Sequence, residues 1–352
     1  MSDRIAEVPE AAGDFAPVEP HVTIVDVARE AEVSIRTVSR VLNGEKYVGE
    51  KMRARVQQVI DRMAFVPSAA ARALPSARTY AVGLIFQRLS ANYLFDIQLA
   101  ALEACRGFGY QLVVEELGPQ ALASQAGIRQ AVKALRVDVA VLLPPLCDND
   151  FLLDALDECG IRYTRLAPAR QQDRSSAMTM DDAAATGEMV HHLVELGHRR
   201  LGFVAGHPDH ASAQNRLQAF WDSVDECGLQ RSDIVVGQGD YSYDSGVRAA
   251  QAMLSGPRRP TAIFASNDLM AAGAIAAAGE LGMITPRDLS VCGFDDSPIS
   301  RHIWPPLTTV RQPLTEMARC AVEQLLSSKQ RKAIGFDFTL IKRASTTRPP
   351  DL

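Results

Sequence analysis

The chain has 352 residues and a formal net charge of −5, with 47% hydrophobic and 22% charged residues, which is the balance of a globular protein. No apolar run approaches the roughly 18 residues that a membrane-spanning helix needs, and the acidic first residues do not resemble a secretory signal. The six cysteines are scattered without a CxxC pair, which argues against a disulfide framework or a zinc ribbon and favours a cytoplasmic protein.

Charge is unevenly distributed along the chain. Residues 1–20 hold one arginine, five acidic residues and three prolines, so we expect a disordered acidic tail there. Residues 21–78 hold ten Lys/Arg against six Asp/Glu, a net charge of +4. A small basic unit ahead of a large acidic one indicates contact with nucleic acid, although solvated charge of this size is also common.

Three short helices are predicted between residues 23 and 65. Thr23 and Ser34 are suitable N-caps for the first two helices, and Asn43-Gly44 is a stop signal for the second. The third is predicted over residues 50–64. Two short helices joined by a tight turn are typical of a helix-turn-helix, with an ordinary helical hairpin as the alternative.

The second of these helices has two distinct faces. Val38, Val41 and Leu42 would face the core. The other face is free to enter a DNA major groove of about 12 Å, where arginine can pair with guanine and asparagine with adenine. The residues of this face are Ile35, Arg36, Ser39, Arg40 and Asn43.

From residue 80 onward, short apolar runs alternate with helical stretches. The runs cover residues 81–86, 112–116, 139–143, 201–205, 234–237, 262–265 and 290–294. This alternation predicts an α/β fold with parallel sheets covered on both faces. The pattern occurs twice, which favours two doubly wound lobes with a ligand cleft beyond the carboxyl ends of their strands.

The string from Val22 to Asn43 closely resembles the lactose/galactose repressor (LacI/GalR) family of transcription regulators. The likeness continues through the segments 65–74, 196–200, 265–268, 291–296 and 305–309, and covers essentially residues 22–348. It implies an all-α helix-turn-helix headpiece at 21–67, a hinge at 68–79, and two lobes at 80–352 that resemble periplasmic sugar-binding proteins, bind an effector and dimerise.

The resemblance implies roles for residues that contact DNA. Ile35 and Arg36 would be the main base-reading pair. The hinge would become helical only on the operator and insert Leu74 between base pairs, since an eight-residue helix is unstable alone. The full set is Thr23, Ser34, Ile35, Arg36, Thr37, Ser39, Arg40, Asn43, Tyr47, Ala71 and Leu74. Gly49, Met52 and Pro75 depart from the family pattern.

The resemblance also implies an effector site between the lobes, formed by Asn92, Tyr93, Ile97, Arg216, Tyr241, Asn267 and Asp295. An aromatic face with arginine, asparagine and aspartate suits a sugar, because unpaired buried polar groups penalise other ligands. Ala167 stands near a position where some sugar-responsive family members have an acidic residue. In this chain, we therefore expect Arg165 or Cys147 to shape that side of the effector site.

The resemblance implies that the protein is a homodimeric, allosteric repressor of carbohydrate-utilisation genes and that a sugar releases it from a palindromic operator. The alternative is a nucleobase-like co-repressor that tightens DNA binding. We expect neither enzymatic activity nor a cofactor, since no phosphate loop or GxGxxG is present. A metal site is not expected at His191, Glu195 and His198, because Gly197 should end their helix, and Asp181-Asp182 should cap one.

Overall fold

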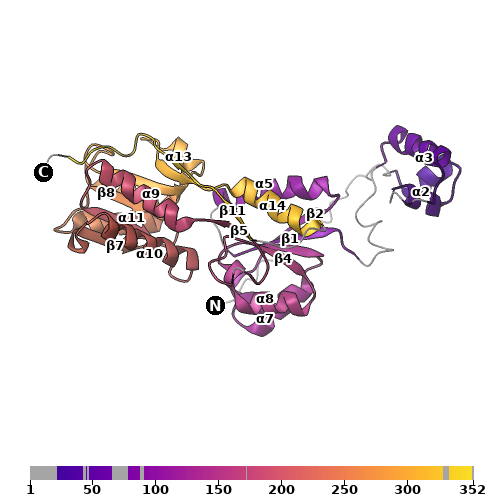
Figure 1. Ribbon diagram of the computed structural model, residues 1–352, viewed down its shortest axis with the longest axis horizontal. Coiled ribbons are helices and arrows are strands. Elements are labelled where there is room, and N and C mark those ends of the chain that lie inside the picture. The colour runs from indigo at the N-terminus through magenta and orange to yellow at the C-terminus, as the bar shows by residue number, and fades with distance from the viewer. Residues whose placement is uncertain are drawn as a thin grey trace, which may run out of the picture. The chain divides into compact units, whose positions relative to one another are not determined.

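The computed structural model describes residues 22–42, 45, 47–65, 78–87, 91–171, 173–327 and 333–350. The chain divides into two compact units, residues 1–77 and 78–352, of which the first is helical and the second α/β (Figure 1). The predicted tail and the predicted DNA contacts Asn43, Ala71 and Leu74 lie outside the described residues. In the described part of the chain, no helix is both long and apolar enough to cross a membrane.

The described part of the first unit contains α1 (Ile24–Glu30), α2 (Ile35–Leu42) and α3 (Glu50–Arg62), as predicted. Thr23 and Asp26 form a capping box at α1, and the Ser34 hydroxyl accepts the Thr37 amide at 3.2 Å at the start of α2. Helix α3 ends two residues before the predicted end, because Ala64 takes a left-handed φ of 48°.

The first lobe of the second unit is built on a sheet whose strand order is β11-β5-β4-β3-β1-β2, with every described pair parallel. Its strands are β1 (Ala81–Phe86), β2 (Gln111–Glu116), β3 (Val139–Leu142), β4 (Arg162–Leu166), β5 (Ser176–Met180) and β11 (Ala333–Phe336). Its helices are α5 (Ala91–Gly107), α6 (Pro119–Leu122), α7 (Gln125–Ala134), α8 (Asp150–Glu158) and α14 (Leu314–Leu326), with a 3-10 turn at Leu146–Asp148.

Side chains alternate along β1 between the two faces of this sheet. Val82, Leu84 and Phe86 pack with α5 and α14, whereas Ile85 packs with α7 and α8. Figure 1 shows these two helix pairs on opposite faces of the sheet. The strands are apolar on both faces because both faces are covered.

The second lobe repeats this plan with the strand order β12-β10-β9-β8-β6-β7, in which only the described pair β10 and β12 is antiparallel. Its strands are β6 (Leu201–Ala205), β7 (Ile234–Gln238), β8 (Ala262–Ala265), β9 (Ser290–Asp295), β10 (Thr308–Arg311) and β12 (Thr339–Ile341). Its helices are α9 (Asp182–Glu195), α10 (Ala211–Glu226), α11 (Tyr243–Ser255), α12 (Asp268–Glu280) and α13 (Ile299–His302), with a 3-10 turn at Arg231–Asp233.

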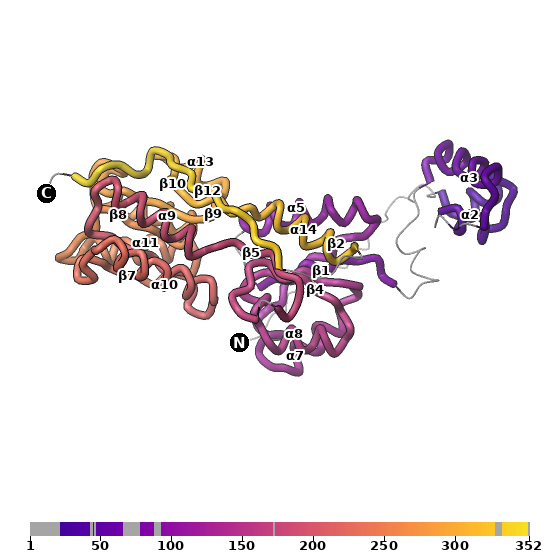
Figure 2. Tube along the Cα trace, in the orientation of Figure 1, coloured from indigo at the N-terminus to yellow at the C-terminus, as the bar shows by residue number. Residues whose placement is uncertain are grey.

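The described chain passes between the lobes at three places: from β5 to α9, from β10 to α14, and from β11 to β12 (Figure 2). The seven predicted strands are all present, each within one residue at either end. The two repeats of the predicted pattern begin with the strands at 81–86 and 201–205. The second lobe itself begins with α9, and α14 and β11 return to complete the first.

Helices α11 and α12 approach so closely that two glycines are required. A Cβ on Gly273 would lie 2.3 Å from the Tyr243 carbonyl oxygen, and one on Gly246 would lie 2.3 Å from the Met270 carbonyl oxygen. Gly279, on the same helix as Gly273, has no atom within 4 Å of such a Cβ.

We therefore expect Gly273→Ala to lower the free energy of unfolding by about 1–3 kcal/mol, because the helices must separate. Gly279→Ala is the matched control and should be neutral or stabilising by up to about 1 kcal/mol, since alanine has the better helix propensity. Denaturant unfolding monitored by circular dichroism measures both, and equal effects of the two variants would contradict the close approach.

Candidate functional site

The face of α2 that was predicted to read DNA is accessible. Ile35 is 48% exposed, and Ser34 and Arg36 are exposed beside it, while Val38 on the opposite face is buried. The face thus presents an exposed guanidinium and an exposed apolar side chain.

The other predicted DNA contacts among the described residues differ in their exposure and in their hydrogen bonds. Tyr47 is 90% exposed. The Thr23 hydroxyl donates to Asp26 Oδ2 at 2.6 Å, Thr37 and Ser34 share a hydrogen bond, and Arg40 pairs with Glu45 at 3.5 Å. Ser39 is half-buried.

Two of the departures from the family pattern, Gly49 and Met52, lie at the third helix. Gly49 occupies the N-cap position of α3, and no side-chain hydrogen bond caps that helix. Met52 is 39% exposed on it.

A cavity of about 1070 Å³ lies between the two lobes of the second unit. Its lining comes mainly from loops that follow the carboxyl ends of strands in both sheets, as expected for ligand sites in doubly wound folds. The volume suits a small organic ligand with surrounding water. We call this cavity the cleft.

Five of the seven predicted effector residues line the cleft: Tyr93, Arg216, Tyr241, Asn267 and Asp295. Ile97 does not line the cleft, because it is fully buried in the first-lobe core. Its apolar side chain belongs to a core cluster that also contains residues of α14. Asn92 lies in α5, and its side chain is not described.

Arg216 is buried and fixed from two sides. Its Nε donates to Asp182 Oδ1 at 2.6 Å, its Nη1 donates to the Ser266 carbonyl oxygen at 2.8 Å, and its guanidinium lies 3.6 Å from the ring centre of Phe294. The paired carboxylate and the ring offset the cost of burying this charge. Within the described residues Nη2 makes no such bond, so it remains as a donor for a ligand.

Asn267 positions Tyr241. Its Oδ1 accepts the Met270 amide and caps α12, and its Nδ2 donates to the Tyr241 carbonyl oxygen at 3.0 Å. Tyr241 has a left-handed φ of 70°, which a non-glycine residue adopts only when its surroundings hold it. Its ring lies against Gly206, where a Cβ would be 2.2 Å away. Asn267 and Gly206 together therefore set the direction of the Tyr241 ring.

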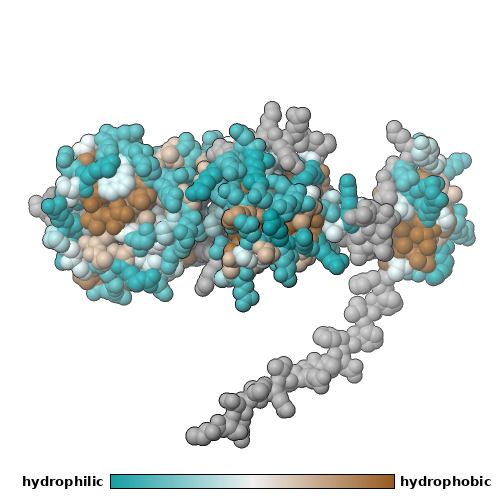
Figure 3. Space-filling model, turned by 90° about the horizontal axis from the view of Figure 1, so that it is seen from below, coloured by the Kyte–Doolittle hydropathy of each residue, from teal (hydrophilic) through white to brown (hydrophobic). Residues whose placement is uncertain are grey.

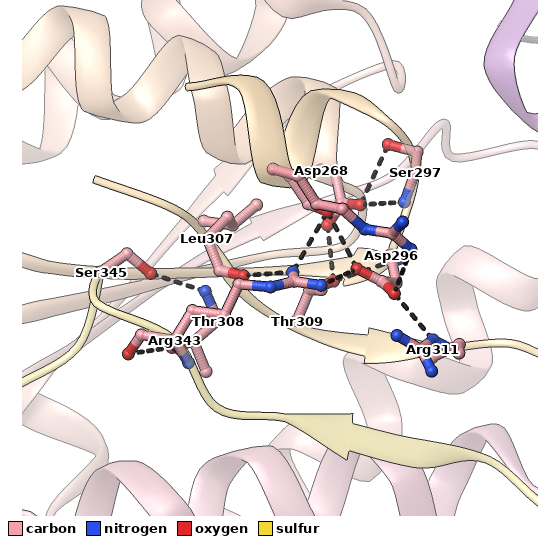
Figure 4. Close-up of polar contacts among 11 residues, drawn as sticks. Asp268, Asp296, Ser297, Leu307, Thr308, Thr309, Arg311, Arg343 and Ser345 are labelled. Atoms are coloured by element: carbon pink, nitrogen blue, oxygen red, sulfur yellow. Dashed lines mark hydrogen bonds and ion pairs between the residues drawn. The ribbon is translucent and has the colours of Figure 1, made fainter. Parts of the chain in front are cut away.

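Adjacent Asp295 and Asp296 have opposite environments. Burial raises the pKa of Asp295 to about 7, although nearby Arg216 and a 2.6 Å hydrogen bond from Gln312 favour its ionised form. The Asp296 side chain is 1% exposed and is bound by three arginines, Arg301, Arg311 and Arg343, the last two of which are labelled in Figure 4. Burial opposes ionisation there too, but the bonds led by Arg343 hold its pKa below the usual value.

Asp268, the first residue of α12, lies close to Asp296 and Ser297 (Figure 4). It accepts hydrogen bonds from the Thr309 hydroxyl at 2.6 Å and from the Ser297 amide at 2.7 Å. Burial, and then the charge of Asp295, raise its pKa well above the usual value. Asp295 thus lines the cleft with a titratable carboxyl group. Asp268 and Asp296 instead connect segments of the second lobe through hydrogen bonds and ion pairs.

Sequence reasoning missed several lining residues, among them His207 and His210. Their rings lie 5.1 Å apart, and the His210 ring lies 5.4 Å from that of Tyr241. Burial, with a smaller effect of His207, lowers the pKa of His210 to about 4, so its ring is neutral near pH 7. The available signal was their position directly after the predicted strand 201–205.

The side chains considered for a metal or an acid–base pair have other roles. His191 bonds to the Gly187 carbonyl oxygen, and His198 bonds to Thr261 and Thr347. Asp181 caps α9 through the Ala184 amide at 2.8 Å, as predicted, while its neighbour Asp182 pairs with Arg216.

Comparison with known proteins gives consistent results for both units. Residues 23–68 match the model of bacterial regulatory proteins of the lacI family, and residues 190–346 match a periplasmic binding protein-like domain. The HTH-type transcriptional repressor PurR of Escherichia coli is 33% identical to this chain, over 86% of this chain and 89% of that protein. The ribose operon repressor of Haemophilus influenzae is 29% identical over 86% and 91%.

Two solved structures of regulators are similar to this chain over more than nine-tenths of its length. The lac repressor dimer bound to operator and the anti-inducer ONPF has a TM-score of 0.78 at 28% identity, covering 93% of this chain and all of that one. A complex of the regulator CelR with cellobiose has a TM-score of 0.68 at 28% identity, covering 92% and 99%.

A helix-turn-helix and a two-lobed α/β unit with a ligand-sized cleft define a ligand-responsive DNA-binding regulator. The chain belongs to the LacI family of bacterial regulatory proteins. It is accordingly a transcriptional repressor and not an enzyme.

The raised pKa of Asp295 predicts a specific pH dependence of stability. The folded protein retains the Asp295 proton up to about pH 7, whereas an unfolded aspartate loses it near a pKa of about 3.9. Asp295 should therefore contribute a fall in the free energy of unfolding as pH rises from about 4 to 7, while the lowered pKa of His210 contributes a rise over part of the same range. Asp295→Asn should remove the Asp295 contribution and leave that of Asp268, which acts in the same direction.

Denaturant titrations of the wild type and Asp295→Asn at several pH values measure the two slopes. Identical slopes would show that Asp295 already has an ordinary pKa in the folded protein.

Proposed function

We propose that this repressor acts as a homodimer that binds a palindromic operator and leaves it when a small sugar-type ligand occupies the cleft. We further propose the boundaries 1–20 for a tail, 21–67 for the headpiece, 68–79 for a hinge and 80–352 for the effector-binding and dimerisation unit. The observation that carries the ligand proposal is the convergence of an aromatic ring, Tyr241, with the polar groups of Arg216 and Asp295 on one cavity.

The operator contact is proposed for the exposed face of α2. Ile35 and Arg36 would read base edges, while Ser34, Thr37 and Tyr47 would orient the headpiece on phosphates. Ala71 and Leu74 would contact the minor groove through the hinge, which would order only when two copies meet on DNA.

Dimerisation is proposed to use exposed apolar side chains of the second unit. Phe95, Leu99 and Phe108 lie on or directly after α5, and Val114 lies on the edge strand β2; these four are 39–63% exposed. Leu281 and Ile284 after α12 are 48% and 51% exposed in the second lobe. Apolar patches interrupt the polar surface of both lobes in Figure 3. Burying such side chains against a second copy is favourable by the hydrophobic effect.

A sugar fits the proposed ligand contacts. The apolar face of a pyranose can stack on Tyr241, and its hydroxyls can accept from Arg216 Nη2 and bond to Asp295 and Tyr93. A relative named as a ribose operon repressor supports this class. Ligand binding would change the angle between the lobes and separate the paired hinges, with a coupling of a few kcal/mol.

A nucleobase co-repressor is the second candidate. The neutral ring of His210 lies beside that of Tyr241 at an interplanar angle of 33°, and a planar heterocycle could stack on either ring. The similarity to PurR favours the same class.

Operator binding in the presence of each ligand class separates the candidates. An operator selected from genomic DNA should be released by D-ribose, D-glucose or cellobiose if a sugar induces, and bound more tightly with hypoxanthine or guanine if a nucleobase is the co-repressor. Fluorescence anisotropy at fixed salt measures both, since affinity depends strongly on salt. A protein that binds no DNA under any condition would reject both candidates.

Arg36→Ala should relax base preference at one position of each half-site and cost about 1–3 kcal/mol there. Arg29→Ala is the control, because Arg29 is an exposed arginine of α1, paired with Asp26, and does not belong to α2. Binding to a library of operators with single base changes measures the effect. Equal weakening on every sequence would assign Arg36 to phosphate contact and not to base reading.

A further inference from the structure

Arg165 of β4 is a fully buried arginine at the base of the first-lobe wall of the cleft. Its Nε donates to the Ser175 hydroxyl at 3.0 Å. Its Nη1 donates to the carbonyl oxygens of Cys147 at 3.3 Å and Arg170 at 3.0 Å, and its Nη2 donates to the Gln171 carbonyl oxygen. One guanidinium thus binds main-chain atoms of two loops, the one after β3 and the one after β4.

Asp148 completes this arrangement from the first of these loops. Its carboxylate lies 4.0 Å from Arg165 Nη1 and balances the buried charge. It accepts the amides of Ala169 at 3.0 Å and of Arg170 at 3.1 Å. The amide of Arg170 is therefore held by Asp148, and its carbonyl oxygen by Arg165. We call Arg165, Asp148 and their partners in the two loops the arginine clamp.

The energy of the clamp explains why a charge is buried here. Removing Arg165 would take this donor from three carbonyl oxygens, of which that of Cys147 belongs to a buried residue, where an unsatisfied polar group is costly. The loop it holds is otherwise strained, since Ala167 and Gln171 have left-handed φ values of 45° and 46°. Both residues lie in the loop whose main chain Arg165 and Asp148 bind.

The clamp acts directly on the wall of the cleft. Pro144, Pro145 and Asn149 from the first loop line the cleft, and Ala167 and Arg170 from the second loop do so as well. Asp148 is occupied by main-chain amides, so Arg170 is the charged side chain that this wall can offer freely to a ligand.

We propose that Arg165 is a positioning residue for the effector site, which fixes the main chain of Arg170 so that the first-lobe wall is ready to receive a ligand. This inference rests on the proposed use of the cleft for an effector. Arg165 itself does not line the cleft, so it acts through Arg170 and the two loops.

The test is hydrogen exchange of the full-length protein without ligand, comparing the wild type with Arg165→Met. Amides of residues 146–149 and 167–171 should exchange about tenfold faster or more in the variant, because their hydrogen bonds depend on the clamp. Arg162→Met is the matched control, because Arg162 lies on the same strand and donates to the Leu325 carbonyl oxygen at 3.0 Å, away from the cleft. It should leave these segments unchanged.

A second readout separates positioning from general stability. If D-ribose or hypoxanthine binds the wild type, Arg165→Met should weaken that probe about tenfold or more, while operator affinity without ligand stays within about twofold. Equal losses in probe and operator affinity would overturn the proposal. If neither probe binds the wild type, the proposed ligand classes fail, and the exchange result alone decides the role of Arg165.

Two milder variants keep the test decisive if Arg165→Met does not fold. Arg165→Lys retains the charge but cannot span both loops, and Ser175→Ala removes one bond. Each should accelerate exchange in residues 167–171 before any other part of the lobe. Unchanged exchange there, or equal acceleration in the second-lobe loops 206–212 and 239–243, would overturn the proposal.

Discussion

The cleft depends on one constraint: the described chain connects two largely parallel sheets at three places, each at the edge where the parallel strands have their carboxyl ends. Parallel strands bring the loops at their carboxyl ends to one edge, and the connections bring the two edges to opposite sides of one cavity. Polar side chains that are far apart in sequence, such as Tyr93 and Asp295, are thereby gathered around a single ligand-sized space.

Much of this architecture could be predicted from the sequence, and the exceptions have physical causes. Strands with apolar residues on both faces were recognised because burial on both faces requires them. Strand β4 was missed because its sequence, RYTRL, carries two arginines. Arg165 is nevertheless buried, since carbonyl oxygens satisfy its donors. Strands β11 and β12 lie at or next to a sheet edge and are partly exposed, so they show no continuous apolar run.

The candidate site was predicted by residue type but not by role. Asn267 was expected to contact the effector; it lines the cleft, and its side chain also caps α12 and holds Tyr241. Ile97 was expected in the site and lies in the core. The sequence also gives no sign that Asp295 and Asp296 differ, because the difference arises from arginines up to 47 positions away. Such roles depend on contacts between distant segments, which residue type and spacing do not reveal.

The contact between Gly206 and Tyr241 has a consequence for altering what this repressor senses. Any side chain at position 206 would displace the ring, and a β-branched residue at 241 would strain a left-handed main chain. These two positions are therefore a poor choice for diversification in a biosensor library. His207 and His210 stand on the same rim without such restrictions on their main chain, so new ligand preferences are more accessible by varying them.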